Sequence, residues 1–339
     1  SKVLNPLHSE TRFLLARIYA SLNRIDEAAA EYNALIMINP EDEEPYLSLS
    51  LIFAAQKNYS QAFKTIKKLL AIDPHSVNAL LALGNLYGEQ QKLDKAEKVF
   101  KKAVAIDPTA EAPLINLATL YDAQNNIPLA IETALKIIAL NPENYHIREK
   151  LAYLYIKTNN LDAALQQYRY VRDAQPYLAD DISIKIGLIY VEQEQWPTAV
   201  EEFASLLKKN PNDDRLQYYL GNALEKIPRL DEALQMFSAV PAASRYFSQA
   251  QMHRGFILVS QGKLHEAQRV LADAVALKPD DIDLYRFLAS LYEKDGKFHG
   301  KAPYLLYGKT LATAQRWLTR RGRKPRFLKI PRKFFVRQL

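Results

Sequence analysis

The sequence contains no cysteine, which excludes disulfide bonds, thiolate metal sites and cysteine nucleophiles. Glycine is scarce as well, with 10 residues in 339. Low glycine together with abundant Ala and Leu predicts a mostly helical chain. No run of about 18 apolar residues occurs, so the sequence predicts no transmembrane helix. No secretory signal peptide is recognisable after Ser1.

Patterns typical of catalysis are also missing. The six histidines do not form a His-Glu-x-x-His pair or any other metal-ligand spacing. There is no phosphate-binding loop, no Gly-x-Gly-x-x-Gly turn and no Gly-x-Ser-x-Gly elbow. Acid pairs such as Glu201–Glu202 and Asp213–Asp214 are interpreted as solvated helix faces or caps. We therefore expect a protein without enzymatic activity, metal site or small-molecule cofactor.

The net charge of +7 conceals two regions of opposite sign. From Gly296 to Leu339 there are 13 Lys or Arg and no acid, whereas the preceding 295 residues hold 32 bases and 38 acids, a net charge of −6. The sequence thus combines a mildly acidic body with a strongly basic C-terminal segment.

Proline recurs along the body with a fixed spacing. Six prolines stand 34 residues apart, and two more continue the series: Pro6, Pro40, Pro74, Pro108, Pro142 and Pro176, then Pro211 and Pro279. A fixed period of this size indicates a repeat architecture, in which each unit contacts mainly its neighbours.

The repeats share four positions besides the proline. They are predicted at 9–42, 43–76, 77–110, 111–144, 145–178, 180–213, 214–247 and 248–281, with Ala179 as one extra residue. Position 8 is small, position 11 is large and usually aromatic, and position 20 is always Ala. Position 24 is large, except at Ala134. Small residues allow two helix axes to approach closely and large residues fill the space beside them, so each repeat is predicted to be a helix pair.

Local signals predict where these helices begin and end. The first helix should stop at a residue able to adopt the left-handed conformation: Asn23, Asn125, Asn159, Gly262 or Gly296. The second should begin at an N-capping residue: Asp26, Ser60, Asp94, Asp162 or Asp231. Pro128 and Pro197 stand near that start, where proline is tolerated. The periodic proline should then end the second helix.

Each repeat thus combines a small residue at position 8, an aromatic residue at positions 11 and 24, alanine at position 20 and proline at position 32. This combination resembles the tetratricopeptide repeat (TPR), over about residues 1–296. The resemblance implies an all-α fold, a right-handed superhelical solenoid of antiparallel helix pairs. First helices would line its concave face and second helices its convex face. The chain also resembles long bacterial multi-repeat proteins, which implies bacterial cytoplasm or a membrane-associated or periplasmic location.

The two ends and one repeat depart from the pattern. Residues 1–8 are interpreted as the end of a truncated preceding repeat, and 282–320 as a ninth first helix, with Ala289 and Tyr292 in register, plus a C-terminal capping helix. Residues 321–339 are predicted to be a flexible basic tail. In 214–247, Pro241 should shorten the second helix. The shortening indicates a local kink or an earlier start of the next helix, or alternatively a hinge.

The resemblance implies that positions 2, 5, 9 and 12 of the first helices face a concave groove. Position 5 is mostly apolar, which fits either packing between neighbouring helices or a groove that binds an apolar peptide or amphipathic helix. The candidate groove residues are Phe13, Leu47, Leu51, Leu81, Asn85, Ile115, Asn116, Lys150, Tyr153, Ile184, Leu188, Tyr218, Asn222, Met252 and Phe256.

Some members of the family grip a C-terminal carboxylate with a set of Lys and Asn residues from consecutive repeats. Here Asn85, Asn116 and Lys150 match that set, whereas Leu81 and His146 replace two of its basic residues. A complete carboxylate clamp is therefore not expected, although the two asparagines could hold the backbone amides of a ligand.

The basic tail offers a second candidate site. Its cations are Arg320, Arg321, Arg323, Lys324, Arg326, Lys329, Arg332 and Lys333. Interleaved aromatic residues make the tail suited to an anionic membrane surface or to nucleic acid, while a solubilising tail without a partner is equally consistent.

These observations favour a non-catalytic scaffold or adaptor that binds a protein or peptide partner in its groove. Two alternatives stay open. One is a membrane- or nucleic-acid-associated assembly factor that docks through the tail, and the other is the regulatory repeat region of a larger protein.

Overall fold

The computed structural model describes residues 6–295, and residues 1–5 and 296–339 are not described. Within the described range the chain forms 17 α-helices and no β-strand. It divides into two compact halves, Ser1–Asn160 and Leu161–Leu339. The capping helix and basic tail expected from the sequence lie outside the described residues, as do most of the residues assigned to a truncated first repeat.

The N-terminal half contains nine helices of similar length in its described part. They are α1 (Pro6–Ser21), α2 (Ile25–Ile38), α3 (Glu43–Ala55), α4 (Tyr59–Ile72), α5 (Val77–Glu89), α6 (Leu93–Ile106), α7 (Glu111–Ala123), α8 (Ile127–Leu140) and α9 (Tyr145–Lys157).

The C-terminal half contains eight helices among its described residues. They are α10 (Leu161–Ala174), α11 (Ala179–Glu192), α12 (Trp196–Lys209), α13 (Asp214–Glu225), α14 (Leu230–Ala239), α15 (Phe247–Ser260), α16 (Leu264–Leu277) and α17 (Ile282–Lys294). The expected ninth first helix is α17.

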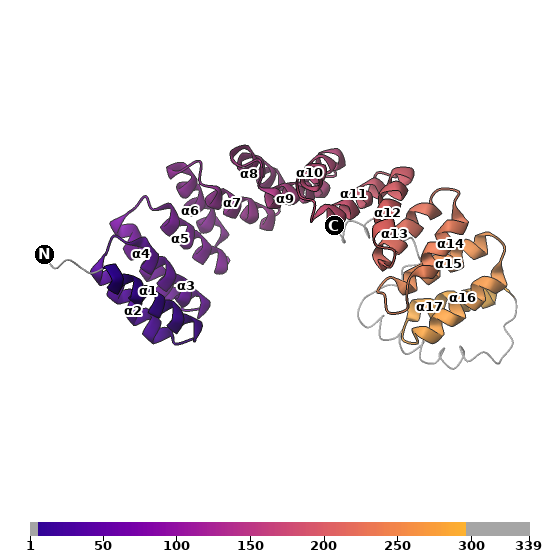
Figure 1. Ribbon diagram of the computed structural model, residues 1–339, viewed down its shortest axis with the longest axis horizontal. Helices are drawn as coiled ribbons and strands as arrows, with labels where there is room; N and C mark the ends of the chain where they lie inside the picture. The colour runs from indigo at the N-terminus through magenta and orange to yellow at the C-terminus, as the bar shows by residue number, and fades with distance from the viewer. Residues whose placement is uncertain (1–5, 296–339) are drawn as a thin grey trace. The chain divides into compact units, whose positions relative to one another are not determined.

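Within each half, successive helices pack against each other as antiparallel pairs, the arrangement of a helical solenoid (Figure 1). Odd-numbered helices correspond to the predicted first helices and are called A helices below. Even-numbered helices correspond to the second helices and are called B helices. The all-α solenoid fold expected from the sequence is confirmed.

Small residues sit where the two helices of a pair approach most closely. The alanine at position 20 is fully buried in every repeat: Ala28, Ala62, Ala96, Ala130, Ala164, Ala199, Ala233 and Ala267 are each 0% exposed. At position 8, three glycines face a phenylalanine at position 24 of the same repeat, namely Gly84 with Phe100, Gly187 with Phe203 and Gly221 with Phe237. Each such pair fills the space between its A and B helices.

The described turns between A and B helices contain one left-handed residue, except the α13–α14 turn. Asn23, Asn125, Asn159 and Gly262 adopt positive φ as predicted, but Lys57, Gln91 and Glu194 do so too, although their types do not favour it. The turn is closed by backbone hydrogen bonds, such as that from the Asn58 amide to the Phe53 carbonyl at 2.8 Å. These bonds fix the conformation whatever side chain is present.

The predicted N-caps of the B helices are wrong by two positions, since the N-caps of α2, α4, α6 and α14 are Arg24, Asn58, Lys92 and Arg229. Asp26, Ser60, Asp94, Asp162 and Asp231 are the second residues of their helices. The turn is shorter than expected, so each helix begins earlier. Asn58 caps α4, because its side-chain oxygen accepts from the Gln61 amide at 3.3 Å. Arg24, Lys92 and Arg229 make no side-chain cap hydrogen bond. The aspartates still stabilise these helices, because a negative charge in the first turn interacts favourably with the positive end of the helix dipole.

The prolines end the B helices as expected. α2, α4, α6 and α8 each stop two residues before the periodic proline. In the seventh repeat, α14 ends at Ala239 before Pro241 and α15 begins at Phe247, one residue earlier than the predicted repeat boundary. A shortened helix followed by an early start is therefore confirmed, while the hinge stays a prediction.

None of the helices within residues 6–295 combines the length and the apolar character needed to span a bilayer.

Candidate functional site

Three A helices of the N-terminal half form a continuous face, since α3 contacts α5 and α5 contacts α7 directly. The position-5 side chains of this face are half-buried: Phe13, Leu47, Leu81 and Ile115. Leu47 packs on the cluster around Tyr46 and Ile66, and Leu81 on the cluster around Phe100 and Leu117. They therefore contribute to packing while keeping part of their surface on the face.

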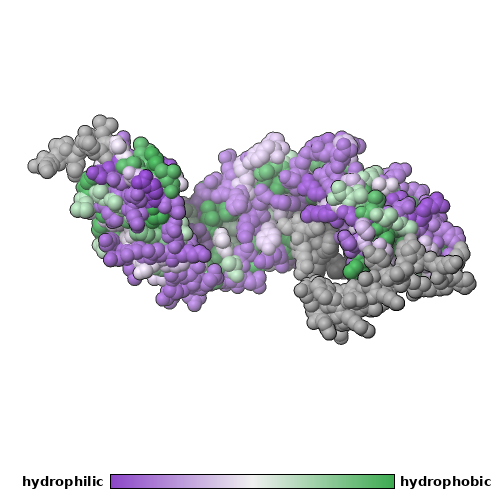
Figure 2. All heavy atoms as spheres, turned by 90° about the horizontal axis from the view of Figure 1, so that it is seen from below, coloured by the Kyte–Doolittle hydropathy of each residue, from purple (hydrophilic) through white to green (hydrophobic). Residues whose placement is uncertain are grey.

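Position 9, one helical turn further on, is more open. Arg17, Leu51, Asn85 and Thr119 are all exposed. Leu51 is 70% exposed, a large apolar side chain that the helix pairs leave in solvent. Figure 2 shows hydrophobic side chains reaching the surface of the N-terminal half among a mainly hydrophilic exterior. Half-buried apolar groups beside exposed ones make a face that an apolar segment could cover.

The two asparagines of the incomplete clamp have free side-chain amides. Among the described residues, neither Asn85 nor Asn116 has a side-chain hydrogen bond to the protein. Asn85 is exposed and Asn116 half-buried. Each carboxamide can donate and accept, which suits the backbone amides of an extended peptide.

Lys150 is not a free cation. Its ammonium forms an ion pair with the Asp122 carboxylate, whose other oxygen lies 2.8 Å from the Lys157 ammonium. Both ammonium groups lie 5.5 Å from the ring centroid of Tyr153. Burial alone would raise the pKa of Asp122, but the hydrogen bonds from Lys150 and Lys157 outweigh it and hold that pKa below its ordinary value.

This cluster changes the interpretation of Lys150. Two lysines share one carboxylate, so the group keeps one net positive charge while its nearest anion is internal. The roles of Asp122 and Lys157 were not predicted from the sequence. Lys150 and Lys157 are seven residues apart, which places them on one face of α9, and this spacing was the available signal.

In the C-terminal half the predicted groove residues are mostly buried. Ile184, Leu188, Tyr218, Asn222 and Met252 are at most 9% exposed. The Tyr218 ring stacks on Tyr246 at 4.9 Å between centroids and meets the edge of His253 at 6.1 Å. The Asn222 amide donates to the Tyr218 carbonyl at 3.0 Å. Tyr218 and Asn222 thus take part in internal contacts, whatever else they bind.

Phe256 is the exception, because it is 37% exposed. Its ring stacks on Phe287 with the centroids 4.2 Å apart. The pair joins α15 to α17 and presents an aromatic surface on the A helices of this half.

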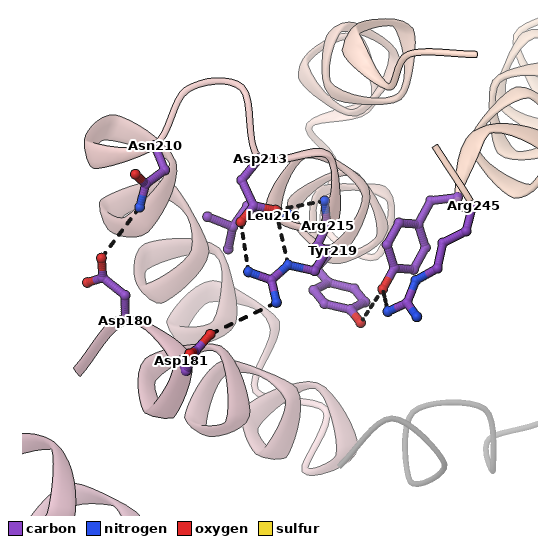
Figure 3. A network of polar contacts seen from close by, with 9 residues as sticks. Asp180, Asp181, Asn210, Asp213, Arg215, Leu216, Tyr219 and Arg245 are labelled. Atoms are coloured by element: carbon purple, nitrogen blue, oxygen red, sulfur yellow. Dashed lines mark hydrogen bonds and ion pairs between the residues drawn. The ribbon is translucent and has the colours of Figure 1, made fainter. Parts of the chain in front are cut away.

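A polar network links the loops of the same half (Figure 3). The Asp213 carboxylate caps α13 by accepting from the Arg215 and Leu216 amides, and the Arg215 guanidinium bonds back to it at 3.0 Å. Burial would raise the pKa of Asp213, but these hydrogen bonds lower it overall. The network fixes the α12–α13 turn.

Within residues 6–295, no group of three or more His, Asp or Glu could hold a metal ion. The tail cations proposed as an anionic-partner site, Arg320 to Lys333, lie outside the described residues.

Family models described as tetratricopeptide repeat match residues 9–42, 53–102, 115–179 and 184–246, which together exceed half of the chain. A peroxisomal targeting signal receptor from Kluyveromyces lactis is 24% identical over 113 residues, 33% of this chain. The chain matches 20% of the length of that curated relative.

Two solved structures share the fold. The C-terminal part of a TPR repeat-containing protein from Cytophaga hutchinsonii matches 71% of this chain and 99% of its own, with 15% identity and a TM-score of 0.59. The Naa15/Naa10 complex bound to HypK-THB matches 74% of this chain and 39% of its own, with 17% identity and a TM-score of 0.52.

Proposed function

Because the chain belongs to the tetratricopeptide repeat family, we propose that it is a non-catalytic scaffold or adaptor that binds a peptide or helix on the A-helix face of its N-terminal half. Membership in the family supports a protein-binding role in general. The specific face is our proposal, and it rests on the side chains described above.

The observation that carries it is the exposure of Leu51 beside half-buried Leu47 and Leu81. An apolar ligand side chain placed there would remove these surfaces from water, at roughly 25 cal/mol for each Å² buried. Asn85 and Asn116 stand on the same face and can bind the ligand backbone. An apolar row flanked by carboxamides suits an extended or helical segment of a protein partner.

Two comparisons are consistent with this role. The Kluyveromyces lactis relative is named as a peroxisomal targeting signal receptor, and the Naa15/Naa10 structure is described as bound to HypK-THB. Both names describe proteins that bind other proteins or signals. The tail alternative, docking on a membrane or nucleic acid, has no such support.

The test starts from peptides selected on the full chain from a displayed library, with affinity then measured by calorimetry. Leu51→Glu should abolish binding, and Leu81→Ala or Ile115→Ala should weaken it by about 1–3 kcal/mol if these are anchors. Met37→Glu is the matched control, since Met37 is 83% exposed but lies on the B helix α2.

Changing Asn85 and Asn116 to Ala separates two binding modes. A ligand held through its backbone should lose much of its affinity, while a purely apolar ligand should barely respond. If Leu51→Glu and Met37→Glu bind equally well with unchanged helix content, the A-helix face is not the binding site.

A further inference from the structure

We propose a second interaction surface, separate from the A-helix face: a basic hollow between α4 and the α5–α6 turn that binds an acidic protein segment. The hollow measures about 840 Å³. It is lined by Ser60, Phe63, Lys64, Lys67, Lys68, Ala71, Tyr87, Gln90, Lys92 and Lys95. Five of these are lysines, none is acidic, and none belongs to the candidate groove residues.

The five lysines have no internal counter-charge. None of them forms an ion pair with a carboxylate of the described residues. The Lys92 ammonium bonds to the neutral Gln90 carboxamide at 2.6 Å, and the Lys95 ammonium lies 5.8 Å from the Tyr87 ring centroid. By contrast Lys101, further along the same helix as Lys95, forms an ion pair with Glu97 at 2.7 Å.

The arrangement costs local stability, which argues against a purely structural role. Lys64 and Lys68 are four residues apart on α4, and Lys64 and Lys67 three apart, so like charges face each other on one side of the helix. α4 contains no acid at all to offset them. An anion in the hollow would remove this repulsion.

The other repeats provide an internal comparison, because the same positions recur in each. At the places of Lys64, Lys67 and Lys68, the first repeat has Ala30, Asn33 and Ala34. The seventh repeat has Gln235, Ser238 and Ala239 there. The third repeat does carry Lys98, Lys101 and Lys102 at these places, but its B helix also contains Glu97, which pairs with Lys101. The helix pair therefore does not need lysine at these positions, and of the two lysine-rich B helices α4 alone contains no acid.

The floor of the hollow is apolar. The rings of Phe63 and Tyr87 lie 5.0 Å apart between centroids, and both are half-buried. Cations around an aromatic floor fit a segment whose carboxylates surround one apolar or aromatic side chain.

The same geometry argues against other anions. Stacked bases need ring faces open to solvent, but here the two rings pack on each other and Lys95 stands over Tyr87. The hollow also lacks arginine, the cation best suited to bidentate phosphate recognition.

The test uses the full chain and a labelled twelve-residue peptide in which Glu and Asp surround a central Phe. Binding should weaken at least tenfold in the triple variant Lys64→Gln, Lys67→Gln, Lys68→Gln. The matched control, Lys208→Gln, Lys226→Gln, Lys263→Gln, removes three exposed lysines from the other half and should change affinity less than twofold. Affinity should also fall as salt is raised.

A second measurement separates the hollow from the basic tail, which shares its charge. Lysine acetylation is followed by mass spectrometry with and without the peptide, and Lys64, Lys67, Lys68 and Lys95 should be protected while Lys208 is not. Protection confined to residues 320–333, or equal losses in the two triple variants, would overturn the proposal. So would tighter binding of a twelve-nucleotide DNA strand or of phosphatidylserine vesicles at this same hollow.

Discussion

The Phe100 ring occupies the place where a side chain on Gly84 would begin. A Cβ built on Gly84 falls well inside contact distance of three atoms of that ring, and the ring is 4% exposed and held among core residues. The same relationship recurs at Gly221, where the nearest atom of Phe237 would lie 2.7 Å from the added Cβ. In these repeats the phenylalanine of the B helix thus requires a glycine on the A helix, whereas Tyr32 and Tyr168 at the same position are buried in repeats that have Ala16 and Ala152.

This relationship predicts opposite effects for two glycines of the same helix. Gly84→Ala should destabilise the fold by about 1–3 kcal/mol through overpacking, although Ala is the better helix former. Gly88→Ala on α5 meets no atom within 4 Å and should be stabilising by up to about 1 kcal/mol. Urea denaturation of both variants measures the difference, and equal signs would contradict the role assigned to Phe100.

The left-handed turn residues predict a stabilising substitution. Lys57 has φ of 57°, a conformation that costs a non-glycine residue roughly 1–2 kcal/mol. Lys57→Gly should relieve part of this cost and raise the free energy of unfolding by up to about 1 kcal/mol. Lys57→Ala removes the same side chain but keeps the strain, so a gain of equal size in that control would show that the charge, not the backbone, was responsible.

The Asp122 cluster predicts a pH dependence of stability. Since the folded-state pKa of Asp122 lies below its unfolded value, the ion pairs stabilise the fold at pH above the unfolded value, and the effect is lost as pH falls through the folded-state pKa. Asp122→Asn should cost about 0.2–1 kcal/mol at neutral pH, because both lysines are partly solvated. The cost should vanish in strong acid.

The cause of that shift can be checked directly by carbon NMR titration of the carboxyl group. Lys157→Gln should move the pKa of Asp122 back up, because it removes one of the two donors. Lys136→Gln, which breaks the exposed pair with Glu132, should leave the titration of Asp122 unchanged. If the pKa of Asp122 rose equally in both variants, the shift would arise from the net charge of the chain and not from the Lys157 hydrogen bond.

Overpacking one repeat should act locally. Ala96 is 0% exposed and belongs to a cluster with Phe100, Leu117 and Ala130. Ala96→Leu should cost about 1–3 kcal/mol, with hydrogen-exchange protection falling most in α5 to α8. Ala123→Leu, at an exposed position of α7, is the control. Uniform loss of protection in every helix would show that stability is not carried by nearest neighbours.

The sequence predicted the fold well because its repeat positions report one helix-packing geometry eight times. Position 20 is alanine in every repeat, and all eight alanines are fully buried. The N-cap error at Asp26 arose because a carboxylate is also favourable one residue inside a helix, so residue type alone did not fix the boundary.

Side-chain pairing was harder to predict than the fold. The sequence placed Lys150 on the groove but could not show that its ammonium forms an ion pair with Asp122, 28 residues earlier. That contact depends on how α9 lies against α7. The lysines of the basic hollow come from two repeats, and only the packing of α4 against the α5–α6 turn brings them around Phe63 and Tyr87.

The equal length of the repeats has a consequence for how this chain tolerates changes in length. Deleting residues 77–110 would join Ser76 to Glu111, a junction like that between Asp42 and Glu43, and would bring Leu120 to the place that Leu86 now fills against α4. Deleting a single residue within α6 would instead turn every later side chain of that helix by about 100°. The one extra residue, Ala179, stands at the start of α11, where it rotates nothing before it. Gain or loss of a whole repeat therefore changes the length of such a chain while preserving the packing between neighbouring repeats.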